Sequence, residues 1–160
     1  MKILGVDPGS RVTGYGIIEK GLKGLALVGY GEIKPPKNAS LTTALASVYE
    51  ALSRLIVDAR PDAMAVEDIF YGKNVQSLIK LGHIRGVTLL AGAQQGVTVH
   101  EYAPLEIKKA VVGYGRAEKS QVQAMVKAIL QLRETPTADA ADALAVAICH
   151  AHCSGPAVSP

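Results

Sequence analysis

Apolar residues open the chain in short segments that are separated by turn residues. The first segment, residues 3–6, ends at Asp7-Pro8-Gly9, and residues 13–18 and 25–33 follow with Gly21 and Gly24 between them. Brief apolar segments bounded by Gly, Pro and Asp are typical of strands joined by tight turns. We therefore expect an antiparallel meander of three strands at the start of the fold.

Further along, apolar positions recur at helical spacing. Residues 41–56 carry apolar side chains three or four positions apart behind a potential cap at Ser40, which predicts a helix that ends near residue 60. Short apolar strands are predicted at residues 63–66 and 97–99, and helices at residues 76–93, 104–112, 119–132 and 138–152. Parallel neighbours need crossover connections, so strands that alternate with helices pair in parallel. The pattern predicts an α/β fold with a five-stranded mixed sheet, a three-strand antiparallel meander plus two parallel strands, flanked by helices.

A single domain accounts for this pattern. The chain has 160 residues and 49% hydrophobic content, which is enough to bury a working core. We expect residues 1–153 to form the domain and residues 154–160 to be a disordered tail. Neither a secretion signal nor an apolar stretch of about 18 residues is present, and two cysteines make no disulfide framework. These features predict a soluble, cytoplasmic protein with no membrane partner.

Four carboxylates stand where apolar residues or helix caps would be expected. Asp7 and Glu67 each end an apolar strand, and functional groups gather at the carboxyl ends of strands in such sheets. Asp139 and Asp142 are the acids of an otherwise apolar helix, and their spacing of three places them on one face. Buried carboxylates need cations, and Mg²⁺ prefers carboxylate and phosphate oxygens. Two such ions about 3.5 to 4 Å apart can hydrolyse a phosphodiester, so the sequence predicts a nuclease site.

Each acid taken alone also has a structural interpretation. Asp139 can favour the helix dipole behind a Thr137 cap, and Asp7 can hydrogen-bond the turn that follows it. Structural carboxylates are common, so this interpretation is the better one for any single acid. One metal site explains all four acids together.

Charge is distributed unevenly along the chain. Residues 71–127 have a net charge of +5, whereas the rest of the chain has a net charge of −2. This asymmetry fits a basic nucleic-acid-binding face beside an acidic site, and it also fits an ordinary solvated surface.

Five segments of the chain resemble the RuvC family of Holliday junction resolvases. In family order they are DPGSRVTGYG from Asp7, VEDIF from Val66, LGHIRGV from Leu81, VVGYGRAEKSQVQ from Val111 and ADAADALA from Ala138. The resemblance implies an RNase H-like fold and a homodimer. It also implies a structure-selective endonuclease that resolves four-way junctions in homologous recombination and DNA repair. Paired symmetrical nicks with 5′-phosphate and 3′-hydroxyl ends are the expected products.

The resemblance also assigns roles to individual residues. It implies that Asp7, Glu67, Asp139 and Asp142 hold two Mg²⁺ ions, for which Mn²⁺ can substitute. Lys119 is implied as a further catalytic residue, because a cation there would stabilise charge on the phosphate.

Further family positions are implied in DNA binding. Phe70 aligns with an aromatic that contacts distorted bases, where a ring can stack on any base, although a core or interface ring is the alternative. Lys108 and Lys119 align with DNA-binding lysines. Weaker candidates for contacts with the DNA backbone are Lys73, Lys80, Arg85, Lys109 and Arg116.

The family also implies partners and a place of action. We expect the branch-migration proteins RuvA and RuvB to deliver the junction to this protein. We expect the dimer surface to lie on the helix of residues 76–93, and the protein to associate with the bacterial nucleoid in the cytoplasm. A zinc site at Cys149, His150, His152 and Cys153 is disfavoured, because a continuous helix points His150 away from the other three side chains.

Three other functions stay open on the sequence. A sugar-kinase or actin-like ATPase shares the opening Asp-x-Gly-Ser pattern but needs a second lobe. A different RNase H-like nuclease would cut RNA hybrids or ribosomal RNA precursors. A non-catalytic module would bind junctions without cutting them, and the complete set of acids argues against it.

Overall fold

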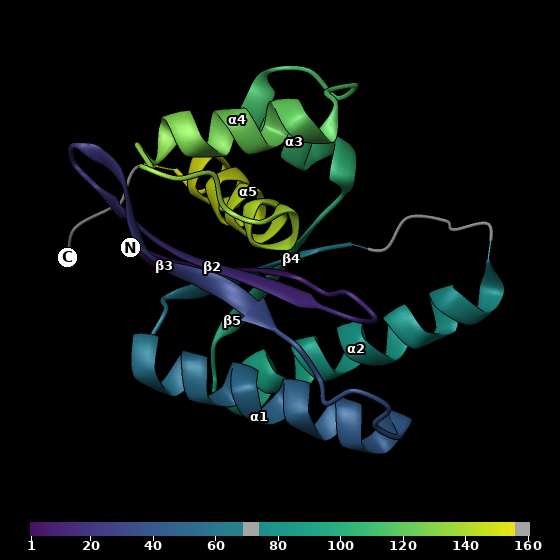
Figure 1. The fold of residues 1–160 in the computed structure, drawn as a ribbon. Helices are drawn as coiled ribbons and strands as arrows, with labels where there is room; N and C mark the ends of the chain where they lie inside the picture. Colours follow the sequence, from purple (N-terminus) through teal and green to yellow (C-terminus); the bar gives the residue numbers. More distant parts are fainter. Residues whose placement is uncertain (69–73, 156–160) are drawn as a thin grey trace.

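In a computed structural model, which describes residues 1–68 and 74–155, five strands form one sheet in the order β3-β2-β1-β4-β5 (Figure 1). The strands are β1 (Lys2–Asp7), β2 (Thr13–Gly21), β3 (Gly24–Ile33), β4 (Ala63–Glu67) and β5 (Thr98–Tyr102). β2 pairs antiparallel with both β1 and β3, whereas β4 pairs parallel with β1 and β5. The predicted meander plus two parallel strands is therefore confirmed. Phe70, Lys73 and most of the predicted tail lie outside the described residues.

Helices cover both faces of the sheet. They are α1 (Leu41–Ala59), α2 (Val75–Gln94), α3 (Pro104–Val112), α4 (Lys119–Ile129) and α5 (Ala138–Cys153). Figure 1 shows α1 and α2 on one face, while α5 lies on the other face beneath α3 and α4. None of the helices in the described ranges is long and apolar enough for a membrane span.

The ends of several elements show where local patterns determine the structure and where pairing does. The predicted cap is confirmed, because the Thr43 amide donates to the Ser40 hydroxyl. α4 ends at residue 129, earlier than predicted, and Gln131 beyond it adopts a left-handed φ of 52°. β5 runs from residue 98 to 102 rather than 97 to 99, because it pairs along β4 as far as the register Glu67–Tyr102. Sheet pairing therefore extends this strand through polar residues.

α5 is the central helix of the larger core layer. Nearly all of its side chains from residue 140 to 151 are buried. Two strand glycines allow this close approach: a Cβ at Gly5 would lie 2.1 Å from the Ala143 carbonyl oxygen, and one at Gly14 would lie 2.0 Å from that of Asp139. The beginning of α5 is consequently pressed against the ends of β1 and β2.

Candidate active site

Asp7 and Glu67 end two neighbouring parallel strands. Val6 of β1 pairs with Val66 of β4, so the next residue of each strand emerges at the same edge of the sheet. The two side chains hydrogen-bond to each other. Burial, reinforced by the nearby Asp142, raises the pKa of Asp7 to about 6. Burial and the charge of Asp7 raise the pKa of Glu67 to about 8, so the two carboxyls share one proton at neutral pH.

The other two acids enter from the first turns of α5. Burial raises the pKa of Asp142, although Lys119 at the start of α4 opposes the shift. Lys119 Nζ lies 2.6 Å from Asp142 Oδ2, and this hydrogen bond raises the pKa of the lysine. Asp7 interacts electrostatically with Asp139 as well as with Asp142. All four acids therefore belong to one electrostatic cluster, in which Lys119 is a cationic neighbour.

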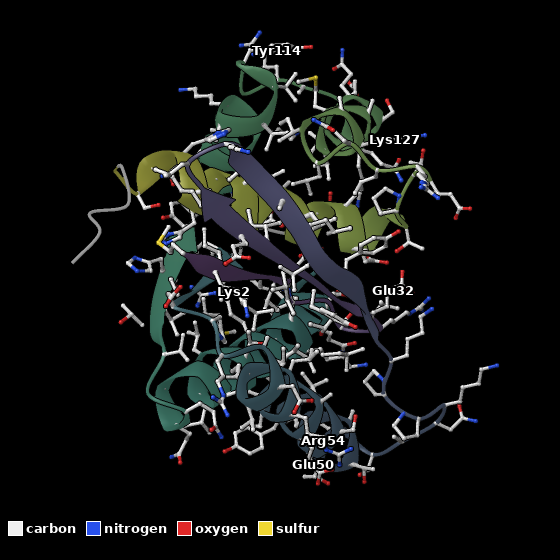
Figure 2. All side chains as sticks on the ribbon, turned by 90° about the vertical axis from the view of Figure 1, so that its left-hand side faces the viewer. Lys2, Glu32, Glu50, Arg54, Tyr114 and Lys127 are labelled. Carbon is white, nitrogen blue, oxygen red and sulfur yellow. The ribbon has the colours of Figure 1, made fainter. Side chains whose placement is uncertain are left out.

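The beginning of α5 is held in place by contacts that the sequence pattern did not reveal. Thr137 is the N-cap residue but makes no capping bond through its side chain. Lys34, at 2.5 Å, and the Thr137 side chain both lower the pKa of the nearby Glu32. Figure 2 shows Glu32 toward the end of β3. The close approach at Gly14 adds a steric constraint, so the strands of the meander position the turn that carries Asp139.

A pocket of about 240 Å³ opens beside this cluster. Its polar lining consists of Glu67, Asp142, Lys108 and Lys119, and its apolar lining consists of Pro104, Ile107, Val122 and Ala145. A pocket lined by two carboxyls, two lysines and apolar side chains suits an anionic group that binds together with cations.

The structure brings only some of the predicted basic residues to the pocket. Lys108 and Lys119 line it, and Lys109 and Arg116 are exposed on the same α3–α4 region. Lys80 is exposed on α2, which covers the opposite face of the sheet (Figure 1).

Arg85 has a different environment from the other predicted cations. Its Nη2 lies 2.9 Å from Asp68 Oδ1 and also pairs with Glu101 Oε2, and its side chain is only 21% exposed. Nη2 of this guanidinium is therefore already engaged by two carboxylates.

The donor set suits a hard divalent cation, although the side chains do not all face one point. Within residues 1–68 and 74–155, no three or more His, Cys, Asp or Glu side chains are arranged to hold a metal ion together. Glu67 shares a proton with Asp7, and Asp142 contacts the Lys119 ammonium. A proton and an ammonium are the positive partners that a divalent ion would replace. Carboxylates whose burial raises the pKa therefore fit Mg²⁺ or Mn²⁺ chemically.

The Cys and His residues near the end of α5 have separate partners. The His150 ring hydrogen-bonds to the Tyr102 hydroxyl at 2.7 Å, and His152 Nδ1 lies 3.0 Å from the Ala110 carbonyl oxygen. Cys149 is buried, whereas Cys153 is exposed.

Comparisons with known proteins agree with one another. The family model for crossover junction endodeoxyribonuclease RuvC matches residues 3–150. Proteins of that description from Syntrophotalea carbinolica and Geobacter sulfurreducens are 54% and 53% identical, covering 96% and 95% of this chain and 95% and 93% of their own lengths. The structure of Thermus thermophilus RuvC in complex with a Holliday junction substrate aligns with a TM-score of 0.88 and 33% identity, covering 94% of this chain and 93% of that one. The yeast mitochondrial Holliday junction resolvase Ydc2 shares the fold. It aligns with a TM-score of 0.67 and 10% identity, covering 93% of this chain and 78% of its own.

Proposed function

Because the chain belongs to the RuvC family of crossover junction endodeoxyribonucleases, we propose that it resolves four-way DNA junctions by hydrolysing two phosphodiester bonds at symmetrical positions. The observation that carries the proposal is the cluster of Asp7, Glu67 and Asp142, in which burial raises the pKa of all three carboxyls. Such a cluster is unfavourable for folding and favourable for binding cations. The fold of the junction-bound relative from T. thermophilus supports junction DNA as the substrate.

The proposed metal ligands are Asp7, Glu67, Asp139 and Asp142. When bound, two Mg²⁺ ions, or Mn²⁺ as a substitute, would supply an activated water and charge stabilisation at the phosphate. With the ions bound, the proton shared by Asp7 and Glu67 would pass to solvent, so that both carboxylates could act as ligands. Lys119, released from Asp142, donates to a phosphate oxygen. The expected products are nicks with 5′-phosphate and 3′-hydroxyl ends.

DNA contacts in this proposal lie around the pocket and, through Lys80, on α2. Lys108, Lys109 and Arg116 come from the α3–α4 region and would neutralise backbone phosphates, which makes binding weaken with salt. Lys80 is exposed and would do so from α2. Phe70 and Lys73, which follow Glu67 in the sequence, are proposed to contact bases and backbone at the junction.

A two-fold homodimer would present one such site to each of two equivalent strands. Ile79 of α2 is 55% exposed and Leu90 is 49% exposed, which supports α2 as the dimer surface. RuvA and RuvB are the proposed partners that deliver the junction, and the proposed place of action is the nucleoid in the cytoplasm.

Cleavage of a synthetic mobile four-way junction tests the proposal directly. The full chain is incubated with the junction, a linear duplex of the same sequence and an RNA–DNA hybrid, with Mg²⁺ or with a chelator. We expect paired nicks on the junction alone and only with Mg²⁺. Preferred cutting of the hybrid would favour a different RNase H-like nuclease, and metal-independent binding without nicks would favour a junction-binding module. Hydrolysis of ATP by the same preparation would support an ATPase instead.

A further inference from the structure

Arg85 of α2 joins two segments that are distant from it in the sequence. Its guanidinium pairs with Asp68, the residue after Glu67, and with Glu101 of the neighbouring strand β5. We propose that Arg85 is a positioning residue that fastens the chain just beyond Glu67 to the sheet, and that it acts on the metal site rather than on DNA. This inference rests on the proposed function of Glu67.

The surroundings of Arg85 favour an internal role. Its side chain is 21% exposed, whereas Lys119 in the pocket is 63% exposed. In the described part of the chain, Arg85 Nε is buried without a hydrogen-bond partner, so the guanidinium is directed toward the two carboxylates even at the expense of one donor. Both carboxylates pair with Nη2, so a phosphate would have to displace them to bind at that nitrogen. Because Arg–carboxylate pairs have a defined geometry, an Arg85 that is itself largely covered suits orientation better than capture of DNA.

The backbone connects this ion pair to Glu67. Glu67 is in register with Tyr102 of β5, and the Asp68 amide donates to the Tyr102 carbonyl at 2.9 Å. Glu101 precedes Tyr102 on the same strand. Arg85 therefore joins the residue that follows β4 to a residue of β5, and a shift of Asp68 would be transmitted through one peptide bond to Glu67.

Replacing Arg85 tests this role through the metal rather than through DNA alone. Arg85→Met keeps the apolar stem and removes the ion pairs. Outer-shell partners of metal ligands typically change metal affinity or activity by about 10- to 100-fold. We expect a loss of that size in Mg²⁺ affinity, measured by calorimetry on the full chain, and a matching rise in the Mg²⁺ concentration needed for junction cleavage. Cleavage should recover at high Mg²⁺, which a general structural defect would not allow.

Salt dependence separates positioning from DNA contact. We expect Arg85→Met to leave the slope of log Kd for junction DNA against log salt unchanged. Lys109→Met, a change at an exposed cation of α3, is the matched control and should reduce the slope by about one. A reduced salt slope for Arg85→Met with unchanged Mg²⁺ affinity would overturn the proposal. A wild-type salt slope together with wild-type Mg²⁺ affinity in Arg85→Met would overturn it as well.

Two further variants cover the remaining outcomes. Asp68→Asn should weaken Mg²⁺ binding as Arg85→Met does, and the double variant should lose no more than either one, because they break the same contact. If Arg85→Met fails to fold, Arg85→Lys, which keeps the charge but loses the forked geometry, should show a smaller loss of Mg²⁺ affinity. Wild-type Mg²⁺ affinity in Arg85→Lys and Asp68→Asn would then contradict the role. A wild-type protein that binds Mg²⁺ but cuts no junction would overturn the proposed function and leave the Arg85 inference to be decided by calorimetry.

Discussion

The two ends of α5 satisfy their polar groups in opposite ways. At the far end, Lys20 Nζ donates to the carbonyl oxygens of Ala151 and Ser154, both at 2.5 Å, and His150 and Tyr102 hydrogen-bond to each other. These partners are all supplied by the protein. The polar groups named here at that end of the helix therefore have hydrogen-bond partners within the protein.

At the near end, α5 brings Asp142 toward two other carboxyls. Asp7 and Glu67 share a proton, and Lys119 contacts Asp142 while remaining mostly exposed. Acids outnumber the cations beside them, and burial raises the pKa of each of these three carboxyls. The contrast shows that one helix can be anchored at one end and electrostatically incomplete at the other, as expected where function opposes stability.

The largest expected effect comes from removing one charge at the incomplete end. Asp7→Asn should lower junction cleavage by at least about 10³-fold, the scale seen when a group that acts at the reacting centre is lost. Binding of junction DNA should persist and the melting temperature should not fall, because one repulsive carboxylate is gone. Asp58→Asn, an exposed change on α1, is the control and should leave cleavage unchanged. Loss of junction binding together with cleavage would make Asp7 a structural residue.

A second expected effect concerns stability and pH at the same end. The folded protein holds a proton on Glu67 up to a pKa of about 8, whereas the ordinary pKa of a glutamate side chain is 4.5. The free energy of unfolding of metal-free protein should therefore fall as pH rises from 4.5 through 8, by on the order of a few kcal/mol. Mg²⁺ should restore the loss most strongly at pH 8, and Glu67→Gln should flatten the curve. A Tm that rises over this range in Glu67-intact, metal-free protein would contradict the shared proton.

Local patterns in the sequence predicted part of this contrast. Asp7 and Glu67 each follow an apolar strand, and parallel pairing of two such strands places their ends together. The spacing of Asp139 and Asp142 needs only a helix. These acids could therefore be singled out from short-range pattern and burial alone.

The remaining features depend on contacts between distant segments. Gly5 and Gly14 are ordinary strand residues until α5 packs on them. Arg85 resembles any helical cation until Asp68, which follows β4, and Glu101 of β5 meet it. β5 contains few apolar residues, so hydrophobic pattern placed it poorly, whereas pairing with β4 defines it.

The anchored end should respond to Lys20→Met with a loss of stability and no loss of chemistry. The ammonium satisfies carbonyl groups at the negative end of the helix dipole, so its removal should cost about 1 to 2 kcal/mol in the free energy of unfolding. Junction cleavage, assayed well below the melting temperature, should be unchanged. Lys23→Met in the exposed β2–β3 turn is the control for loss of charge. A large fall in cleavage would show that the two ends are coupled along the helix.

The smallest expected effect is a pH dependence of opposite sign at that anchored end. Burial, with the nearby His100 and Lys20, lowers the pKa of His150 below its usual 6.5. The unfolded chain therefore takes up a proton that the folded state resists, and the stabilising contribution is complete above pH 6.5 and declines as pH falls. Urea unfolding at pH 7.5 and pH 5.5 should show a small decline that His150→Gln reduces and the exposed His83→Gln does not. The acid end loses stability as pH rises and the histidine end loses it as pH falls, so the two contributions oppose each other between about pH 4.5 and 6.5. The stability of metal-free protein should be highest where they balance. Mg²⁺ should extend that optimum only toward higher pH, and an extension toward lower pH would show that the ion does not bind the acids.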